Sequence, residues 1–101
     1  MNVDRADTFL QRARGLGGRR HLPPGEALLI PRCRSVHTVT MRFALDLIWL
    51  DSAGRVVRVD RAVGRLRFRC CLRARSVLEC HAGEAGRFLA EPRRMAELAQ
   101  L

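Results

Sequence analysis

The stretch CRSVHTVTMRFALDLIWLDSAGRVVRVD, residues 33–60, decides the fold class of this chain. Residues 45–50, LDLIWL, have β-strand residue types with little alternation, which is typical of a strand covered on both faces. The DSAG segment that follows is a hairpin-turn signal, because Gly54 can adopt a positive φ. Residues 55–60 are therefore predicted to pair back as the next strand. The alternation in residues 36–43, VHTVTMRF, predicts another strand before it.

Shorter signals flank this stretch on both sides. Helices are predicted at residues 6–16, 84–89 and from 92 onward, and further strands at 26–30, 65–76 and, as a separate strand, 75–80. In residues 65–70 arginines alternate with Leu66, Phe68 and Cys70, so these three side chains are predicted to face the core. About six short strands separated by frequent turns predict a mainly β (α+β) fold. The expected architecture is an antiparallel sandwich or partly closed barrel with flanking short helices.

Length and composition limit the class of protein. With 101 residues the chain is predicted to form a single domain, with a core at about residues 6–90 and a C-terminal helical tail at 91–101. The net charge is +9, and all nineteen basic residues are arginine. No apolar run approaches the roughly 18 residues of a membrane span, and the first residues lack the apolar region of a signal peptide. A basic, arginine-rich, cytoplasmic protein is therefore expected.

The chain has four cysteines, none of them in a C-x-x-C pair: Cys33, Cys70, Cys71 and Cys80. Free thiols are expected in a reducing cytoplasm. Cys33 and His37, combined with Cys80 and His81, are the one metal candidate, because thiolates and imidazoles suit zinc. They lack the paired spacing of a structural zinc site, so the sequence predicts no metal and no cofactor.

Four side chains inside the apolar stretch are the candidate ligand-binding residues: Arg34, His37, Met41 and Asp46. If the strand at 36–43 pairs with the strand at 45–50, His37 and Asp46 could approach one another. A carboxylate that orients an imidazole is the start of general-base chemistry. The alternative is structural, with a buried Asp46 that accepts backbone N–H groups or an arginine. No motif such as G-x-S-x-G supplies a nucleophile, so no catalytic residue is assigned and an enzyme is not favoured.

The strand predicted at 65–76 carries Arg65, Arg67 and Arg69 on one face, and Arg73 and Arg75 join them if the extended conformation continues. Guanidinium groups suit phosphate, so this arginine face is a candidate polyanion- or nucleic-acid-binding surface. The chain has no Tyr and Phe68 is predicted to point inward, so recognition of single strands by stacking is not expected. An acidic protein, an anionic surface and a merely solvated face stay open as alternatives.

Several short motifs occur in a fixed order along the chain. They are R-G-L at 14–16, G-E-A-L-L at 25–29, Met41, L-D at 45–46, L-D-x-x-G-R-V-V at 50–57, A-x-x-V-L-E at 74–79 and A-G at 82–83. Taken in order, over about residues 6–90, they resemble the bacterial domain-of-unknown-function family 192. The resemblance implies a mainly β, jelly-roll-like fold and no established activity. Homologues of this kind are often found with secretion or pilus-assembly genes, which implies an accessory role there.

The leading hypothesis is a small cytoplasmic β domain that is not an enzyme and binds a small ligand or a partner segment. Its site is predicted near Arg34, His37, Met41 and Asp46. Two alternatives stay open: a hydrolase-like enzyme that uses His37 and Asp46, and a polyanion-binding module that uses the arginine face. The sequence does not identify the partner, although its charge suits an acidic protein or a polyanion.

Overall fold

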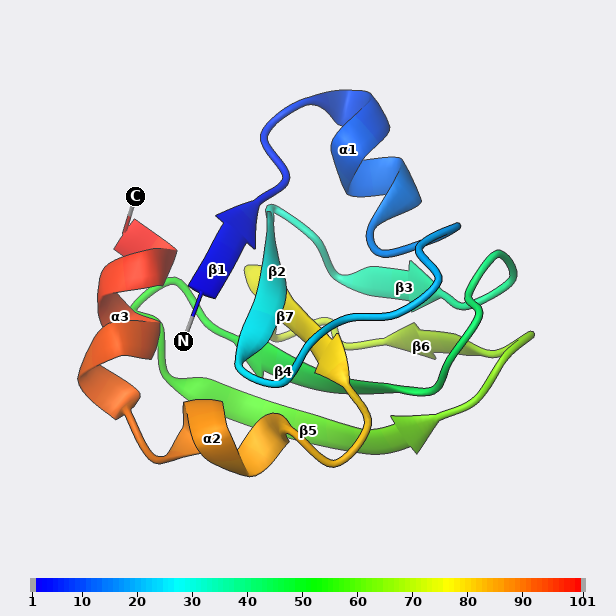
Figure 1. Ribbon diagram of the computed structural model, residues 1–101. Coiled ribbons are helices and arrows are strands. Elements are labelled where there is room, and N and C mark those ends of the chain that lie inside the picture. Colours follow the sequence, from blue (N-terminus) through cyan, green and yellow to red (C-terminus); the bar gives the residue numbers. More distant parts are fainter. Residues whose placement is uncertain (1, 101) are drawn as a thin grey trace.

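The structure of the protein, a computed structural model, describes residues 2–100 and contains seven strands and three helices within them. In chain order these are β1 (Asn2–Arg5), α1 (Phe9–Arg14), β2 (Glu26–Pro31), β3 (Ser35–His37), β4 (Leu45–Leu50), β5 (Val56–Val63), β6 (Phe68–Cys70), β7 (Ser76–His81), α2 (Ala85–Leu89) and α3 (Pro92–Gln100). Five strands form one sheet in the order β1-β2-β7-β4-β5, and β3 and β6 form a separate two-stranded ribbon (Figure 1). The β1–β2 pair is parallel, and the other pairs are antiparallel.

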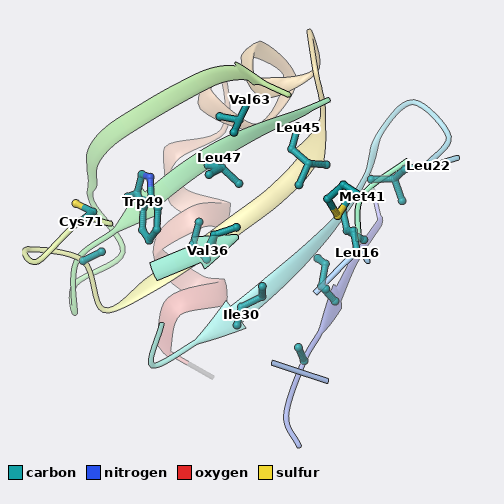
Figure 2. Close-up of a cluster of buried hydrophobic side chains, with 14 residues drawn as sticks. Leu16, Leu22, Ile30, Val36, Met41, Leu45, Leu47, Trp49, Val63 and Cys71 are labelled. Atoms are coloured by element: carbon teal, nitrogen blue, oxygen red, sulfur yellow. The ribbon is translucent and has the colours of Figure 1, made fainter. Parts of the chain in front are cut away.

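Strand β4 is the centre of the core, because each of its six residues is buried. Side chains alternate across a strand, so Leu47 and Trp49 enter one hydrophobic cluster and Ile48 and Leu50 enter another. The β3–β6 ribbon and the segment after α1 cover the first cluster (Figure 2), whereas α2 and α3 cover the second. Cover on both faces explains why the apolar run of β4 shows so little alternation.

The predicted hairpin between β4 and β5 is confirmed. Gly54 has a φ of 81°, and Asp51 Oδ1 accepts hydrogen bonds from the backbone N–H groups of Ala53 and Arg55, both at 2.9 Å. The same turn lies against α3, where a Cβ added to Gly54 would collide with the backbone of Ala96. Glycine at this position therefore serves both the turn and the packing of α3.

The strand predicted at residues 36–43 is shorter than expected and ends at His37. The cause is Thr38, a buried residue at which the chain turns. Its Oγ1 donates a hydrogen bond to the carbonyl oxygen of Gly64 at 2.6 Å and accepts one from the backbone N–H of Arg67 at 2.8 Å. A side chain that bonds two backbone groups offers the chain an alternative to the strand ladder.

The prediction of which side chains in and just before β6 face the core is wrong. Leu66 and Phe68 are 66% and 63% exposed and Cys70 is also exposed, although all three were expected to face the core. Alternation indicates that two faces differ, but it does not tell which face is inward. In the ribbon, Val36 is buried, and its cross-strand partner Arg69 shares that inner face.

The mainly β class is confirmed, with differences in architecture. The described residues contain seven strands rather than about six, they form no closed barrel, and their order does not confirm a jelly roll. Strand β1, which was not expected, has the polar sequence NVDR, and it is a strand because it pairs with β2 in parallel. The predicted C-terminal tail includes α3, and this helix buries Met95 in the second cluster.

Replacing Gly54 by alanine tests whether the hairpin turn and α3 are packed as described. The change combines a left-handed φ with a backbone collision, so we expect the free energy of unfolding in urea to fall by about 3 kcal/mol. Gly83→Ala has a φ of 94° but open space, and we expect it to cost only about 1 kcal/mol. Gly86→Ala in α2 meets nothing and serves as the control. Equal losses at Gly54 and Gly83 would contradict the packing argument.

Candidate functional site

Asp46 is a buried anchor on the side of β4 that faces α2. It is 1% exposed. Its Oδ1 accepts a hydrogen bond from the N–H of Ala62 at 2.8 Å, and its Oδ2 accepts two more, from Gly83 at 2.9 Å and Ala85 at 3.1 Å. Ala62 has a φ of 51°, a left-handed conformation that is uncommon for alanine. The carboxylate therefore ties the end of β5 and the start of α2 to the central strand.

The four residues predicted to form a ligand site lie apart. Met41 is buried in the first cluster. Arg34 is exposed and its Nε donates a hydrogen bond to the carbonyl oxygen of Ala74 at 3.0 Å. His37 is exposed on β3, in the layer that covers the first cluster, whereas Asp46 faces the opposite side of the sheet. The structure does not bring His37 and Asp46 together, and it gives Asp46 the structural surroundings named as the alternative.

One cavity does collect polar side chains from distant parts of the sequence. It has a volume of about 230 Å³ and lies where the end of α1, the ribbon strand β3 and the sheet strand β7 meet. Its polar lining includes Arg12, Arg14, Cys33, His37 and Glu79, and we call it the Glu79 cavity. Of the four predicted site residues, only His37 lines it.

Glu79 is the unexpected member of this set. It is only 3% exposed, and its Oε1 accepts a hydrogen bond from the backbone N–H of Leu16 at 3.1 Å. Burial raises the pKa of Glu79 to about 7, and the Leu16 N–H and the guanidinium of Arg19 only partly oppose this effect. Near neutral pH this carboxyl group can therefore either donate or accept a hydrogen bond inside the cavity.

The chain can approach the Glu79 carboxyl so closely because Gly15 has no side chain. Gly15 has a φ of 54°, and a Cβ added to it would lie 2.7 Å from Glu79 Oε1. The glycine thus lets the next residue, Leu16, present its N–H to the carboxyl. The R-G-L and V-L-E motifs, far apart in the sequence, meet at this point.

Cys33 contributes a protonated thiol to the cavity. Burial raises its pKa above the ordinary value, and its Sγ donates a hydrogen bond to the carbonyl oxygen of Ser35 at 3.1 Å. Cys80 lies in the second cluster, where burial raises its pKa to about 12. The predicted metal candidates are thus divided between the two sides of the sheet. Within residues 2–100, no three or more His, Cys, Asp or Glu side chains form a group that could hold a metal ion.

Glu79 was not among the predicted site residues. The useful signal was its position inside the strand segment SVLEC, where every residue is buried. Acidic residues are almost never fully buried unless they are paired. Glu79 inside β7, like Asp46 inside β4, therefore indicates a structural or functional role. Its importance could be predicted, but its neighbours could not, because α1 and β3 are distant in the sequence.

The fold and the cavity define a small mainly β domain with a polar pocket beneath a short helix. Residues 1–94 match the model of family DUF192, the domain-of-unknown-function family 192 described as an uncharacterized ACR. The chain therefore belongs to this family, and the predicted resemblance is confirmed.

Two solved structures have the same fold. A protein of unknown function from Novosphingobium aromaticivorans is 22% identical, with a TM-score of 0.75 over 84% of this chain and 66% of that one. A candidate transcription regulator from Sinorhizobium meliloti is 24% identical, with a TM-score of 0.75 over 85% of this chain and 72% of that one. No curated protein matches the sequence. Among residues 2–100, no helix has the length and hydropathy needed to cross a membrane.

Truncating Asp46 tests its role as an anchor. Asp46→Ala removes the acceptor of three backbone N–H groups, so we expect the free energy of unfolding in urea to fall by about 3 kcal/mol. Asp51→Ala removes an acceptor at a solvent-exposed turn and is expected to cost about 1 kcal/mol. A smaller loss at Asp46 than at Asp51 would contradict the anchoring role.

Glu79 should make stability depend on pH. Its pKa is raised to about 7 in the folded protein, so the folded state keeps a proton that the unfolded chain releases above its ordinary pKa. Stability should therefore fall by about 3 kcal/mol as the pH rises from about 4.5 to about 7, and then stay level. Glu79→Gln should remove this fall and be more stable than the parent protein at pH 8 in urea titrations. The exposed Glu97→Gln is the control, and a fall that persists in Glu79→Gln would exclude Glu79 as its source.

Proposed function

We propose that the protein is a non-enzymatic binding domain whose site is the Glu79 cavity. The observation that carries the proposal is a buried carboxyl group, with a pKa of about 7, that lines a cavity with two arginines and a histidine. A buried ionisable group reduces stability above its unfolded pKa, and such groups are concentrated at functional sites. Convergence of polar side chains from α1, β3 and β7 is also typical of a binding site.

The cavity favours a small acid as ligand. Its volume of about 230 Å³ lies below the roughly 300–1,000 Å³ of pockets that hold drug-sized molecules. The guanidinium groups of Arg12 and Arg14 suit a carboxylate or phosphate group. Glu79 at neutral pH can donate a hydrogen bond to, or accept one from, a second polar group. The proposed ligand class is thus a small carboxylic acid with a second polar group.

Two observations favour binding over catalysis: the protonation of the Cys33 thiol, and the position of Asp46. The raised pKa of Cys33 keeps its thiol protonated, and the thiolate is the reactive form. Asp46 accepts three backbone hydrogen bonds on the other side of the sheet, so the hydrolase-like alternative with His37 has no geometric support. A cytoplasmic location and an accessory role in secretion or pilus assembly belong to this proposal and rest on the sequence and the family resemblance.

Titration with small acids, followed by two-dimensional NMR of the labelled protein, tests the proposal. With acetate, malate and inorganic phosphate as probes, we expect saturable shifts centred on the amides of Gly15 and Leu16. Binding should weaken about tenfold in Arg12→Gln, because one charge-assisted hydrogen bond is lost. It should also weaken as the pH rises above 7, since an ionised Glu79 repels an acid.

The control is Arg93→Gln, an exposed change on α3. It should leave the affinity unchanged. Shifts that arise elsewhere, or equal losses in Arg12→Gln and Arg93→Gln, would contradict the site. Chemical conversion of a probe that is lost in Glu79→Gln would show that the cavity is catalytic instead.

A further inference from the structure

The net charge of the protein is concentrated in two segments of the sequence. Residues 27–45 and 61–78 contain three and six arginines and no acidic residue, whereas the rest of the chain has ten arginines and ten acidic residues. The whole net charge of +9 therefore comes from these two acid-free segments. Strand β3 lies in the first segment and β6 in the second, and the two strands pair with each other. Of these nine arginines, Arg34, Arg65, Arg67 and Arg69 lie in the two ribbon strands or within a few residues of them.

These arginines are available to a partner. Eight of the nine are exposed and Arg69 is half-buried. Among the described residues, the ion pairs involve Arg5, Arg55, Arg58 and Arg87, which all lie outside the two segments. Within residues 2–100, no acidic side chain therefore forms an ion pair with an arginine of the two acid-free segments.

Apolar side chains lie exposed in the same layer. Four of the five large exposed hydrophobic residues among the described ones belong to the two acid-free segments, and their exposed fractions are 53% for Val39, 66% for Leu66, 63% for Phe68 and 79% for Leu72. Val39 follows Thr38, whose carbonyl oxygen accepts the N–H of Leu66 at 3.3 Å, so Val39 and Leu66 lie at the same end of the ribbon. We call these four residues the apolar stripe.

Leu66 adds a conformational observation. Its φ of 59° is in the left-handed region, where a branched side chain is strained. Glycine would relieve that strain, and it would also remove an exposed apolar group. A strained backbone beneath an exposed leucine is hard to explain by stability, and such positions are concentrated at functional surfaces.

We infer that the outer face of the β3–β6 ribbon docks onto an anionic lipid surface, with the apolar stripe in the acyl boundary and the surrounding arginines at the headgroups. Amphipathic elements with a cationic margin bind membranes in this way. Each basic residue near an anionic surface strengthens binding about fivefold. Arginine is suited to this position because its long apolar stem can lie along the boundary while the guanidinium stays with the headgroups.

The charge and side-chain types favour lipid over other partners. A second copy of this chain would bring one uncompensated arginine layer against another, which is repulsive. A single-stranded nucleic acid would match the charge, but it is held by stacking on aromatic rings, and only Phe68 in the stripe has such a ring. The aliphatic Val39, Leu66 and Leu72 offer nothing to a base, whereas they gain from burial in lipid.

Sedimentation with vesicles tests the inference. The protein is mixed with vesicles of phosphatidylcholine alone or with about 30% phosphatidylglycerol, at low and at high salt. We expect binding only to the anionic vesicles and weaker binding at high salt. The variant Leu66→Ser/Phe68→Ser should bind at least tenfold more weakly, while Val56→Ser, an exposed change on β5, should bind as the parent does. Far-ultraviolet circular dichroism verifies that each variant is folded.

Two charge-reversal variants test which arginines contribute to vesicle binding. Arg65→Glu/Arg67→Glu and Arg20→Glu/Arg93→Glu change the net charge equally, but only the first pair lies in an acid-free segment. Loss of at least tenfold in the first pair alone supports the inference. Equal losses in both pairs, or equal binding to neutral vesicles, would overturn it. So would tight binding of a fluorescent thymidine oligonucleotide without binding to anionic vesicles, which would assign the face to nucleic acid.

Discussion

The structure depends on the burial of β4 on both of its faces. Because neither face can be left to solvent, the chain has to supply a cover for each one. The β3–β6 ribbon and the segment after α1 cover one side, and α2 and α3 cover the other. Asp46 can be buried here only because its carboxylate accepts hydrogen bonds from three backbone N–H groups. Those bonds attach β5 and α2 to the strand, so the charge that interrupts the apolar run also fixes its neighbours.

Asp46 and Glu79, the two buried acids of the sheet, differ in the number of hydrogen bonds that they accept. This difference indicates which of them is structural and which belongs to a site. Asp46 and Glu79 lie on the paired strands β4 and β7, yet they face opposite sides: Glu79 lies opposite Leu47 of the first cluster, and Asp46 lies opposite Cys80 of the second. Asp46 accepts three backbone hydrogen bonds, whereas Glu79 accepts one, from Leu16. With so little compensation, burial dominates and the pKa of Glu79 rises to about 7. Of the two acids, Glu79, which accepts fewer hydrogen bonds, is the one that lines the Glu79 cavity.

The sequence predicts the parts of the fold that depend on local chemistry. The buried β4, the turn at Gly54 and the β5 return follow from residue types and turn preferences, and the ordered motifs predict the family. The parts that depend on pairing between distant segments could not be predicted in the same way. The polar β1 is a strand only because β2 lies beside it, and the inward face of β6 is decided by its partner Val36. The cavity belongs to the second kind, because Gly15 and Glu79 are far apart in the sequence and meet only in the folded chain.

The two sides of the sheet differ in how firmly they can be held. On one side, α2 and α3 bury Phe88 and Met95 completely. On the other side, the ribbon has only two short strands, and a two-stranded element is marginally stable unless something packs against it. It also carries uncompensated positive charge, which opposes close packing. Local opening should therefore begin at the ribbon, because Val36 is the one residue of its two strands that belongs to the first cluster. Because β3 also lines the Glu79 cavity, a ligand there would contact the most easily opened layer and hold it against the sheet. A ligand that binds only when the ribbon is closed stabilises the closed state. Ligand binding in the Glu79 cavity should therefore reduce the local opening of the ribbon, because β3 belongs to both.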